Sequence, residues 1–192
     1  SVANGMSLTK EYTFSSKGTY EVKATANNGK ETLVETITFI YMNAAVQQNY
    51  PGGVPKMGAV ENADGTVTFC LAAPGKKSVI LVPSWDDYQT LDKNVMKYQD
   101  YNGNRYFWTT VSGLDPNKEY PYYYVVDATI KVGDPYAKLV LDPYSDKWLD
   151  KNVYPGLINY PFEKGLDGIM LAVYKGTRDN YNWKVKNFVA PD

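Results

Sequence analysis

Carboxylates are the side chains of this sequence whose types and spacing come closest to catalysis. Asp86 and Asp87 are adjacent, and Asp134 and Asp142 each precede a proline. Either pair could suggest the two carboxylates of a glycosidase or the oxygen ligands of calcium. A glycosidase pair must flank a cleft, and nothing in the sequence places these residues across one. Aspartates in loops and before proline are ordinary turn residues, so we predict no catalytic residue and no metal site.

Histidine is absent from the 192 residues, and Cys70 is the single cysteine. Every Ser-His, Cys-His and His-metal arrangement is therefore excluded, as is an intrachain disulfide. Cys70 lies in the strand-like run 66–71, where we expect a buried and inert thiol. We predict no cofactor.

Tyrosine and tryptophan are abundant, with 18 Tyr and 4 Trp against 6 Phe. Their rings combine a flat apolar face with a polar tip, which suits contact with wet, neutral surfaces such as sugar rings. Tyrosine is also common in strands for structural reasons alone. The net charge of −1 argues against nucleic acid and against anionic membranes as partners. No stretch approaches the roughly 20 apolar residues that a membrane helix needs. We expect a neutral partner and a monomer.

The first element to consider is a hairpin between about 19 and 42. Residues 19–25 alternate apolar and polar side chains, Asn28-Gly29 favours a tight turn, and 32–42 returns. The segment is too small to hold a core by itself. It therefore indicates either the last strands of an Ig-like module that starts upstream, or strands that dock on a second domain.

A second, larger β module is predicted after a linker at 47–55, which is rich in Pro and Gly. Short strands separated by turn residues predict a β-sandwich. The tail after 145 is irregular, with one more possible strand at 168–174. The strands that we expect span 58–61, 66–72, 78–83, 105–111, 120–127 and 137–141.

Residues 56–144 resemble the glycogen-binding, isoamylase-N-terminal type of β-sandwich. Residues 79–88 resemble that family's strand and its G-x-F-N-x-W loop. Residues 111–114 followed by 120–127 resemble its Gly-Leu and Y-x-Y-x-V-D hairpin, and 133–137 resemble its DPYA element. The order of these elements carries the resemblance. It implies an all-β fold with an immunoglobulin-like sandwich of the E-set type.

Parts of the tail resemble the connector that enters the catalytic barrel of bacterial α-amylase-family enzymes. These parts are 146–148, 153–155, 181–183 and 187–191. The resemblance implies a domain order: partial Ig-like strands at 1–46, the linker at 47–55, the glycogen-binding-type sandwich at 56–144, and a connector at 145–192 toward an absent barrel. The catalytic carboxylates of that family lie in the barrel, so none is carried onto this sequence.

Glucan binding in such modules rests on aromatic rings stacked on sugar C–H faces. Tyr88 holds the loop position of the family's stacking Trp, and Trp85 stands where the family usually has a Phe. The sequence departs from the family at Tyr123, which replaces a sugar-bonding Lys, and near Ile130, which replaces a second stacking Trp. Lys131 follows and could supply a hydrogen-bond donor.

Strand alternation adds a fifth candidate, Trp108. Phe107 occupies the family's core position, so Trp108 faces outward or toward another module. Burial against the tail or the first module is the alternative. By the same parity Tyr122 and Tyr124 should lie in the core, and Tyr123 should point away from it.

The sequence thus predicts a non-catalytic accessory region of a secreted α-glucan hydrolase, acting outside the cytoplasm or at the cell surface. It would bind starch-like or glycogen-like polysaccharide, or support its own C-terminal catalytic barrel. A purely structural spacer and the N-terminal module of an α/β-hydrolase esterase remain alternatives. Sequence downstream would distinguish a barrel signature from a Gly-x-Ser-x-Gly elbow.

Overall fold

The computed structural model describes residues 9, 11–166 and 168–176 of the chain. Within them the secondary structure consists of antiparallel strands and four short 3-10 turns, with no α-helix, so the predicted all-β class is confirmed. The resembling segments 181–183 and 187–191 lie outside the described residues. The four turns are η1 (Ser84–Asp86), η2 (Asp92–Asn94), η3 (Asp146–Trp148) and η4 (Phe162–Lys164).

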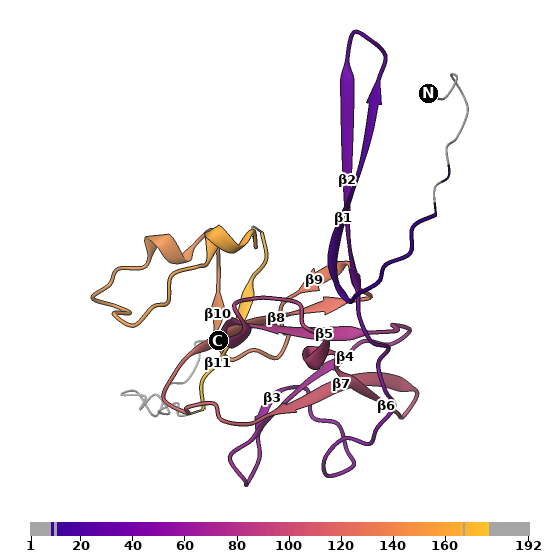
Figure 1. The fold of residues 1–192 in the computed structure, drawn as a ribbon. Coiled ribbons are helices and arrows are strands. Elements are labelled where there is room, and N and C mark those ends of the chain that lie inside the picture. The colour runs from indigo at the N-terminus through magenta and orange to yellow at the C-terminus, as the bar shows by residue number, and fades with distance from the viewer. Residues whose placement is uncertain (1–8, 10, 167, 177–192) are drawn as a thin grey trace, which may run out of the picture.

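Two antiparallel sheets form the body of the molecule (Figure 1). One sheet has the strand order β3-β4-β7-β6 and the other β10-β11-β8-β5, with β9 pairing β8. The first contains β3 (Gly58–Glu61), β4 (Val67–Ala72), β7 (Asn104–Val111) and β6 (Lys97–Tyr101). The second contains β10 (Val140–Leu141), β11 (Leu171–Tyr174), β8 (Tyr120–Val126), β5 (Val79–Pro83) and β9 (Ile130–Val132).

The main core lies between these sheets and follows the two-residue period of the strands. Phe69, Leu81, Phe107, Tyr122 and Tyr124 all belong to this buried cluster. The predicted core positions of Phe107, Tyr122 and Tyr124 are therefore confirmed.

Side chains on the other face of the second sheet form a separate cluster. Ile80, Val82, Tyr123 and Val125 point there, where residues of the segment 157–166 and Ile169 pack over them. Strands β5 and β8 are thus covered on both faces, which explains their nearly continuous runs of apolar residues.

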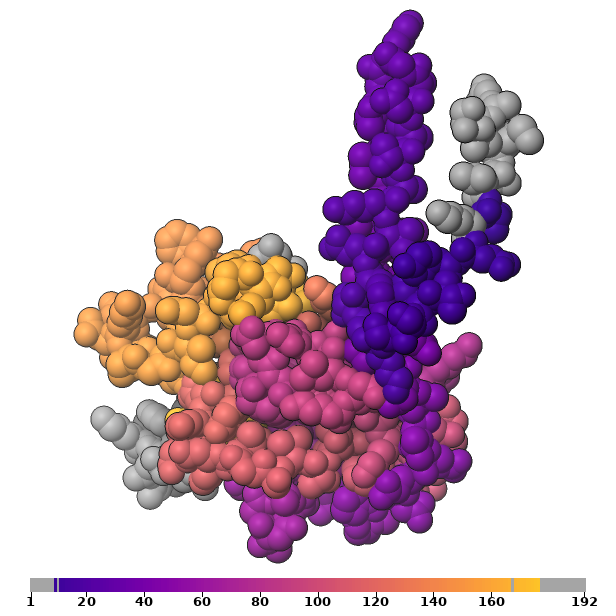
Figure 2. Space-filling model, in the orientation of Figure 1, coloured from indigo at the N-terminus to yellow at the C-terminus, as the bar shows by residue number. Residues whose placement is uncertain are grey.

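A two-stranded hairpin projects from this body (Figures 1 and 2). It consists of β1 (Gly18–Asn27) and β2 (Thr32–Tyr41), close to the predicted strands. One face carries most of the apolar side chains, and Val22, Leu33 and Ile37 on this face are exposed. Phe14 covers the base of the same face by packing against Tyr20 and Phe39.

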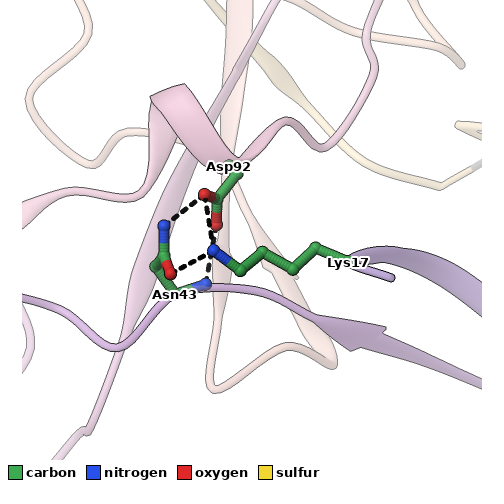
Figure 3. A network of polar contacts seen from close by, with 3 residues as sticks. All are labelled: Lys17, Asn43 and Asp92. Carbon is green, nitrogen blue, oxygen red and sulfur yellow. Dashed lines mark hydrogen bonds and ion pairs between the residues drawn. The ribbon is translucent and has the colours of Figure 1, made fainter. Parts of the chain in front are cut away.

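Polar contacts attach the hairpin to the loop 84–94 (Figure 3). The Asp92 carboxylate accepts hydrogen bonds from the Asn43 backbone N–H at 2.7 Å and from the Lys17 ammonium at 3.1 Å. The Asn43 amide also bonds both side chains. Ile40 and Met42 pack on the cluster that covers the other face of the second sheet, so apolar contacts also hold the base of the hairpin.

The first residues of the predicted linker pair with the edge strand β6. Gln48 N donates to Tyr98 O at 2.8 Å, and Tyr98 N donates to Val46 O at 2.9 Å. Tyr50 is buried beside Trp108 and Cys70. Residues 51–54 then form an exposed turn before β3.

Candidate functional site

Three of the five candidate binding residues line one cleft of about 290 Å³. These are Tyr88, Tyr123 and Lys131, and we name the cavity the Tyr88 cleft. It lies where the hairpin base, the loop 84–94, strands β8 and β9 and the segment 164–166 meet. Its lining comprises Thr19, Thr38, Ile40, Tyr88, Thr90, Tyr123, Val125, Ala128, Thr129, Lys131, Lys164 and Leu166.

Tyr88 reaches the cleft because the chain reverses after η1. Asp87 and Tyr88 both adopt left-handed backbone angles, with φ of 55° and 57°. The turn is closed by hydrogen bonds from Asp87 N to Ser84 O and from Tyr88 N to Pro83 O, both 3.0 Å. Such angles are costly for residues other than glycine and occur often at functional sites. Burial, reinforced by the negative charge of Glu163, raises the pKa of the Tyr88 hydroxyl to about 12.

A second left-handed pair borders the cleft at the turn between β8 and β9. Asp127 and Ala128 have φ of 47° and 61°. They are the central residues of a turn closed by Thr129 N, which donates to Val126 O at 3.2 Å, within a three-residue loop between the paired Val126 and Ile130. The Asp127 carboxylate accepts hydrogen bonds from Lys77 N at 2.7 Å and Ser78 N at 3.1 Å. This turn fixes the start of β9 and therefore the position of Lys131.

The polar groups of the cleft are hydroxyls and ammonium groups. Lys164 pairs with Asp87 at 2.6 Å, whereas the exposed Lys131 has no ion-pair or hydrogen-bond partner among the described residues. Thr19 and Thr90 share a hydrogen bond of 2.8 Å across the hairpin–loop junction. Hydroxyls both donate and accept, and Lys131 donates. The described lining contains no carboxylate or thiol, so the arrangement can hold a neutral polar ligand but has no nucleophile–base pair.

Tyr123 contributes to the floor of the cleft with only 3% of its surface exposed. Burial raises the pKa of its hydroxyl to about 12. Its side chain points away from the inter-sheet core, as strand parity predicted. The half-buried ring of Tyr88 is therefore the main aromatic surface that the cleft offers to a ligand.

Trp85 does not line the Tyr88 cleft. Its ring packs against the inter-sheet core, with ring centroids 5.9 Å from Phe69 and 5.7 Å from Tyr120. The remaining exposed part of the ring borders a different groove.

Trp108 is 3% exposed and lies on the face of its sheet away from the inter-sheet core. Its indole N–H donates to Gln48 O at 3.0 Å, and its ring meets Tyr50 at 5.9 Å. The segment 46–50 therefore covers it, which is close to the alternative that strand parity left open. We leave Trp108 out of the site for this reason.

No sequence pattern marked the other residues of the cleft as candidates for binding. Thr19, Thr38, Thr90 and Lys164 come from separate segments that only the fold brings together. The exposed Ile130 is not part of the lining.

The acidic pairs have structural roles. Asp134 is buried and accepts hydrogen bonds from the hydroxyls of Tyr122 at 2.7 Å and Tyr124 at 3.1 Å. Asp142 accepts hydrogen bonds from the backbone N–H groups of Tyr144 and Ser145 in a turn. Within the described part of the chain, no three Cys, Asp or Glu side chains gather as metal ligands would.

The thiol of Cys70 is buried, as predicted. Burial, together with the nearby charge of Asp134, raises the pKa of Cys70 to about 12. A thiol in this state is a poor nucleophile.

None of the helical segments in the described residues is long and apolar enough to cross a bilayer. No protein-family model matches the chain, and no curated protein is significantly similar to it.

Proposed function

We propose that this chain is a non-catalytic accessory region of a secreted α-glucan hydrolase and that it binds α-glucan in the Tyr88 cleft. The observation that carries the proposal is the convergence of Tyr88, Tyr123 and Lys131 on one cavity lined with hydroxyls. Tyr88 comes from the loop 84–94, whereas Tyr123 and Lys131 lie on the paired strands β8 and β9. Of the three, only Tyr88 matches a sugar-contacting position of glycogen-binding modules; Tyr123 stands where the family has a Lys, and Lys131 is a nearby donor. The fold brings the loop of Tyr88 to the β8–β9 hairpin, which carries the other two.

The strand order supports an immunoglobulin-like sandwich of the E-set type built from 56–144 together with β11, which lies in the segment expected as a connector. Labelled from β3 onward, the sheets read A-B-E-D and C-F-G, with β11 in the place of G. This is the order of Ig-type sandwiches. The exposed apolar face of β1 and β2 likewise supports their belonging to a separate Ig-like module beside the sandwich. An isolated two-stranded hairpin is only marginally stable in water.

The cleft suits a sugar for simple physical reasons. A pyranose ring can place its apolar C–H face on the ring of Tyr88, while its hydroxyls bond the ammonium of Lys131 and the hydroxyls of Thr90 and Thr129. At about 290 Å³ the cavity is at the lower end of ligand pockets, so it takes one or two sugar residues. We therefore expect weak binding that becomes useful on a polymer.

A structural spacer without ligand is the second candidate. The near-complete burial of Tyr123 favours it, because this ring offers a sugar little more than an edge. In that case the sandwich would serve only to support the neighbouring barrel.

Affinity electrophoresis in gels containing amylopectin separates the two candidates. The proposal predicts that the wild-type chain is retarded and that Tyr88→Ala and Lys131→Ala each reduce the retardation. Tyr144→Ala and Lys151→Ala are matched controls, because both residues are exposed and lie outside the cleft. Unretarded migration of the wild-type chain would leave only the spacer role.

A further inference from the structure

A second open groove, of about 430 Å³, adjoins the same loop 84–94 and shares no lining residue with the Tyr88 cleft. We propose that it is a second binding groove for neutral oligosaccharide, with Trp85 and Tyr120 as its aromatic walls. The proposal rests on the proposed function, since the ligand is of the same class. We name the cavity the Trp85 groove. It is lined by Trp85, Lys93, Asn94, Thr109, Thr110, Val111, Ser112, Gly113, Leu114 and Tyr120.

The two aromatic walls are held rigidly from behind. Trp85 meets Tyr120 nearly perpendicularly, at 80° and 5.7 Å between ring centroids. Trp85 backs onto Phe69, and Tyr120 stacks with Tyr174 at 6.5 Å. Both rings keep part of their surface exposed. A ligand ring therefore meets a preformed apolar corner and orders little of the protein on binding.

The hydroxyl of Tyr120 is also oriented. It accepts a hydrogen bond from Asp115 N at 2.9 Å, which leaves its O–H free to donate. Among the described residues it has no other hydrogen-bond partner.

Asp86 positions the polar groups on the opposite rim. Its side chain is only 9% exposed, and its two oxygens bind two neighbours. One accepts from the Lys93 ammonium at 2.5 Å and the other from the Asn94 amide at 2.8 Å. Asn94 keeps its carbonyl as an acceptor, and Lys93 keeps two N–H donors. The Asn94 amide is thus oriented before a ligand arrives, and the ion pair keeps the exposed Lys93 ammonium near the same rim.

Charge and polarity together select a neutral polyol. Lys93 is the one charged residue in the described lining, and Asp86 neutralises it. A purely apolar ligand would leave the amide of Asn94 and the hydroxyls of Thr109 and Ser112 without partners. A sugar satisfies both the aromatic corner and these polar groups.

One loop supplies an aromatic side chain to each site. The left-handed turn at Asp87 and Tyr88 separates Trp85, in the groove, from Tyr88, in the cleft. A polymer that reaches both sites would gain avidity from two weak contacts. An oligosaccharide too short to reach both sites would not gain this avidity.

Fluorine NMR of the 5-fluorotryptophan-labelled chain tests the groove directly. Trp85→Phe assigns the Trp85 resonance, and maltoheptaose is the titrant. We expect a saturable shift of this resonance in the wild-type chain and an unchanged shift in the Tyr88→Ala, Lys131→Ala double variant. Asp86→Ala and the shape-conserving Thr109→Val should each weaken the titration by about fivefold. Asp87→Ala is the matched control and should leave the midpoint as it is, because Asp87 pairs with Lys164 beside the other cleft.

The outcomes separate this proposal from the proposed function. A Trp85 resonance that stays fixed while amylopectin still retards the chain overturns the groove alone. A shift that vanishes in the double variant also overturns it, because the signal would then report the Tyr88 cleft. The absence of both the shift and the retardation overturns the proposed function together with the groove.

Discussion

At the scale of single residues, the carboxylate of Asp134 is a buried polar group that needs hydrogen-bond donors around it. It lies between the sheets and accepts hydrogen bonds from two tyrosine hydroxyls and from the backbone N–H of Tyr136. Burial, with the charge of Asp134 beside it, raises the pKa of Tyr122 far above its ordinary value. The carboxylate and the hydroxyls therefore depend on each other for their hydrogen bonds.

Replacing this carboxylate should destabilise the fold. Asp134→Ala leaves the hydroxyls of Tyr122 and Tyr124 buried without an acceptor, and we expect a loss of roughly 2–4 kcal/mol in the free energy of unfolding. Urea denaturation measures it. Asp134→Asn keeps an acceptor oxygen, so its free energy of unfolding should fall by less. An Asp134→Ala variant as stable as Asp142→Ala, which alters only a turn, would contradict this role.

The buried tyrosines should make the free energy of unfolding depend on pH in the alkaline range. Burial raises the pKa values of Tyr123 and Tyr174 to about 12, from an ordinary value of 10.0. The folded state thus holds these protons more tightly than the unfolded state. Their contribution to stability is complete below pH 10 and is lost as pH rises toward about 12.

Denaturation at a series of pH values tests this dependence. The free energy of unfolding should fall steadily above pH 10, and Tyr123→Phe should reduce the slope. A free energy that stays constant up to pH 12 would show that these hydroxyls ionise as easily in the folded chain as in the unfolded one.

At the scale of elements, the hairpin of β1 and β2 depends on its base. The backbone N–H of Asn43 is the main cause that lowers the pKa of Asp92 below its ordinary value, and Lys17 adds to it. The folded value is depressed, so this contact stabilises the hairpin above pH 3.8 and weakens as pH falls below it.

Loss of the Asp92 carboxylate should loosen the hairpin and spare the body. We expect Asp92→Ala to speed tryptic cleavage after the exposed Lys23 and Lys30, while the thermal transition of the sandwich stays nearly unchanged. Asp100→Ala removes a comparable surface pair, to Arg105 at 2.8 Å, and serves as control. Equal cleavage rates in the two variants would mean that apolar contacts of Ile40 and Met42 hold the base alone.

The elements differ in how far the sequence predicted them. Turn residues and alternation placed the exposed hairpin. Runs of apolar residues placed β4, β5, β7, β8 and the last strand, β11, because these strands bury one or both faces. Strand β6 was missed because its residues, Lys97 to Tyr101, are polar and lie at an edge where pairing needs little apolar surface. Strand β9 is three residues long and exists only through its pairing with β8.

The site was predictable only in part for a related reason. The family motif pointed to Tyr88, and the departures from it drew attention to Tyr123 and Lys131. The threonine neighbours of these residues come from segments whose proximity depends on the whole fold. Trp108 was ambiguous because parity gives the direction of a side chain and not what covers it. Here the covering segment, 46–50, lies in the region that composition marked as a linker.

At the scale of the whole molecule, the proposed function makes the loop 84–94 the centre of the binding surface. The loop is fastened to the hairpin through Asp92 and Thr90, and it presents Tyr88 and Trp85 to different cavities. Each cavity is small and open, so the account expects weak affinity for short oligosaccharides and stronger retention by polymer.

Amide chemical-shift mapping with maltoheptaose tests the central claim most directly, because it locates the ligand without altering the protein. The account predicts saturable shifts that include Tyr88, Thr90, Thr129 and Lys131 around the Tyr88 cleft, with cellohexaose producing smaller changes. Shifts confined to other surfaces, or none at millimolar maltoheptaose, would contradict it.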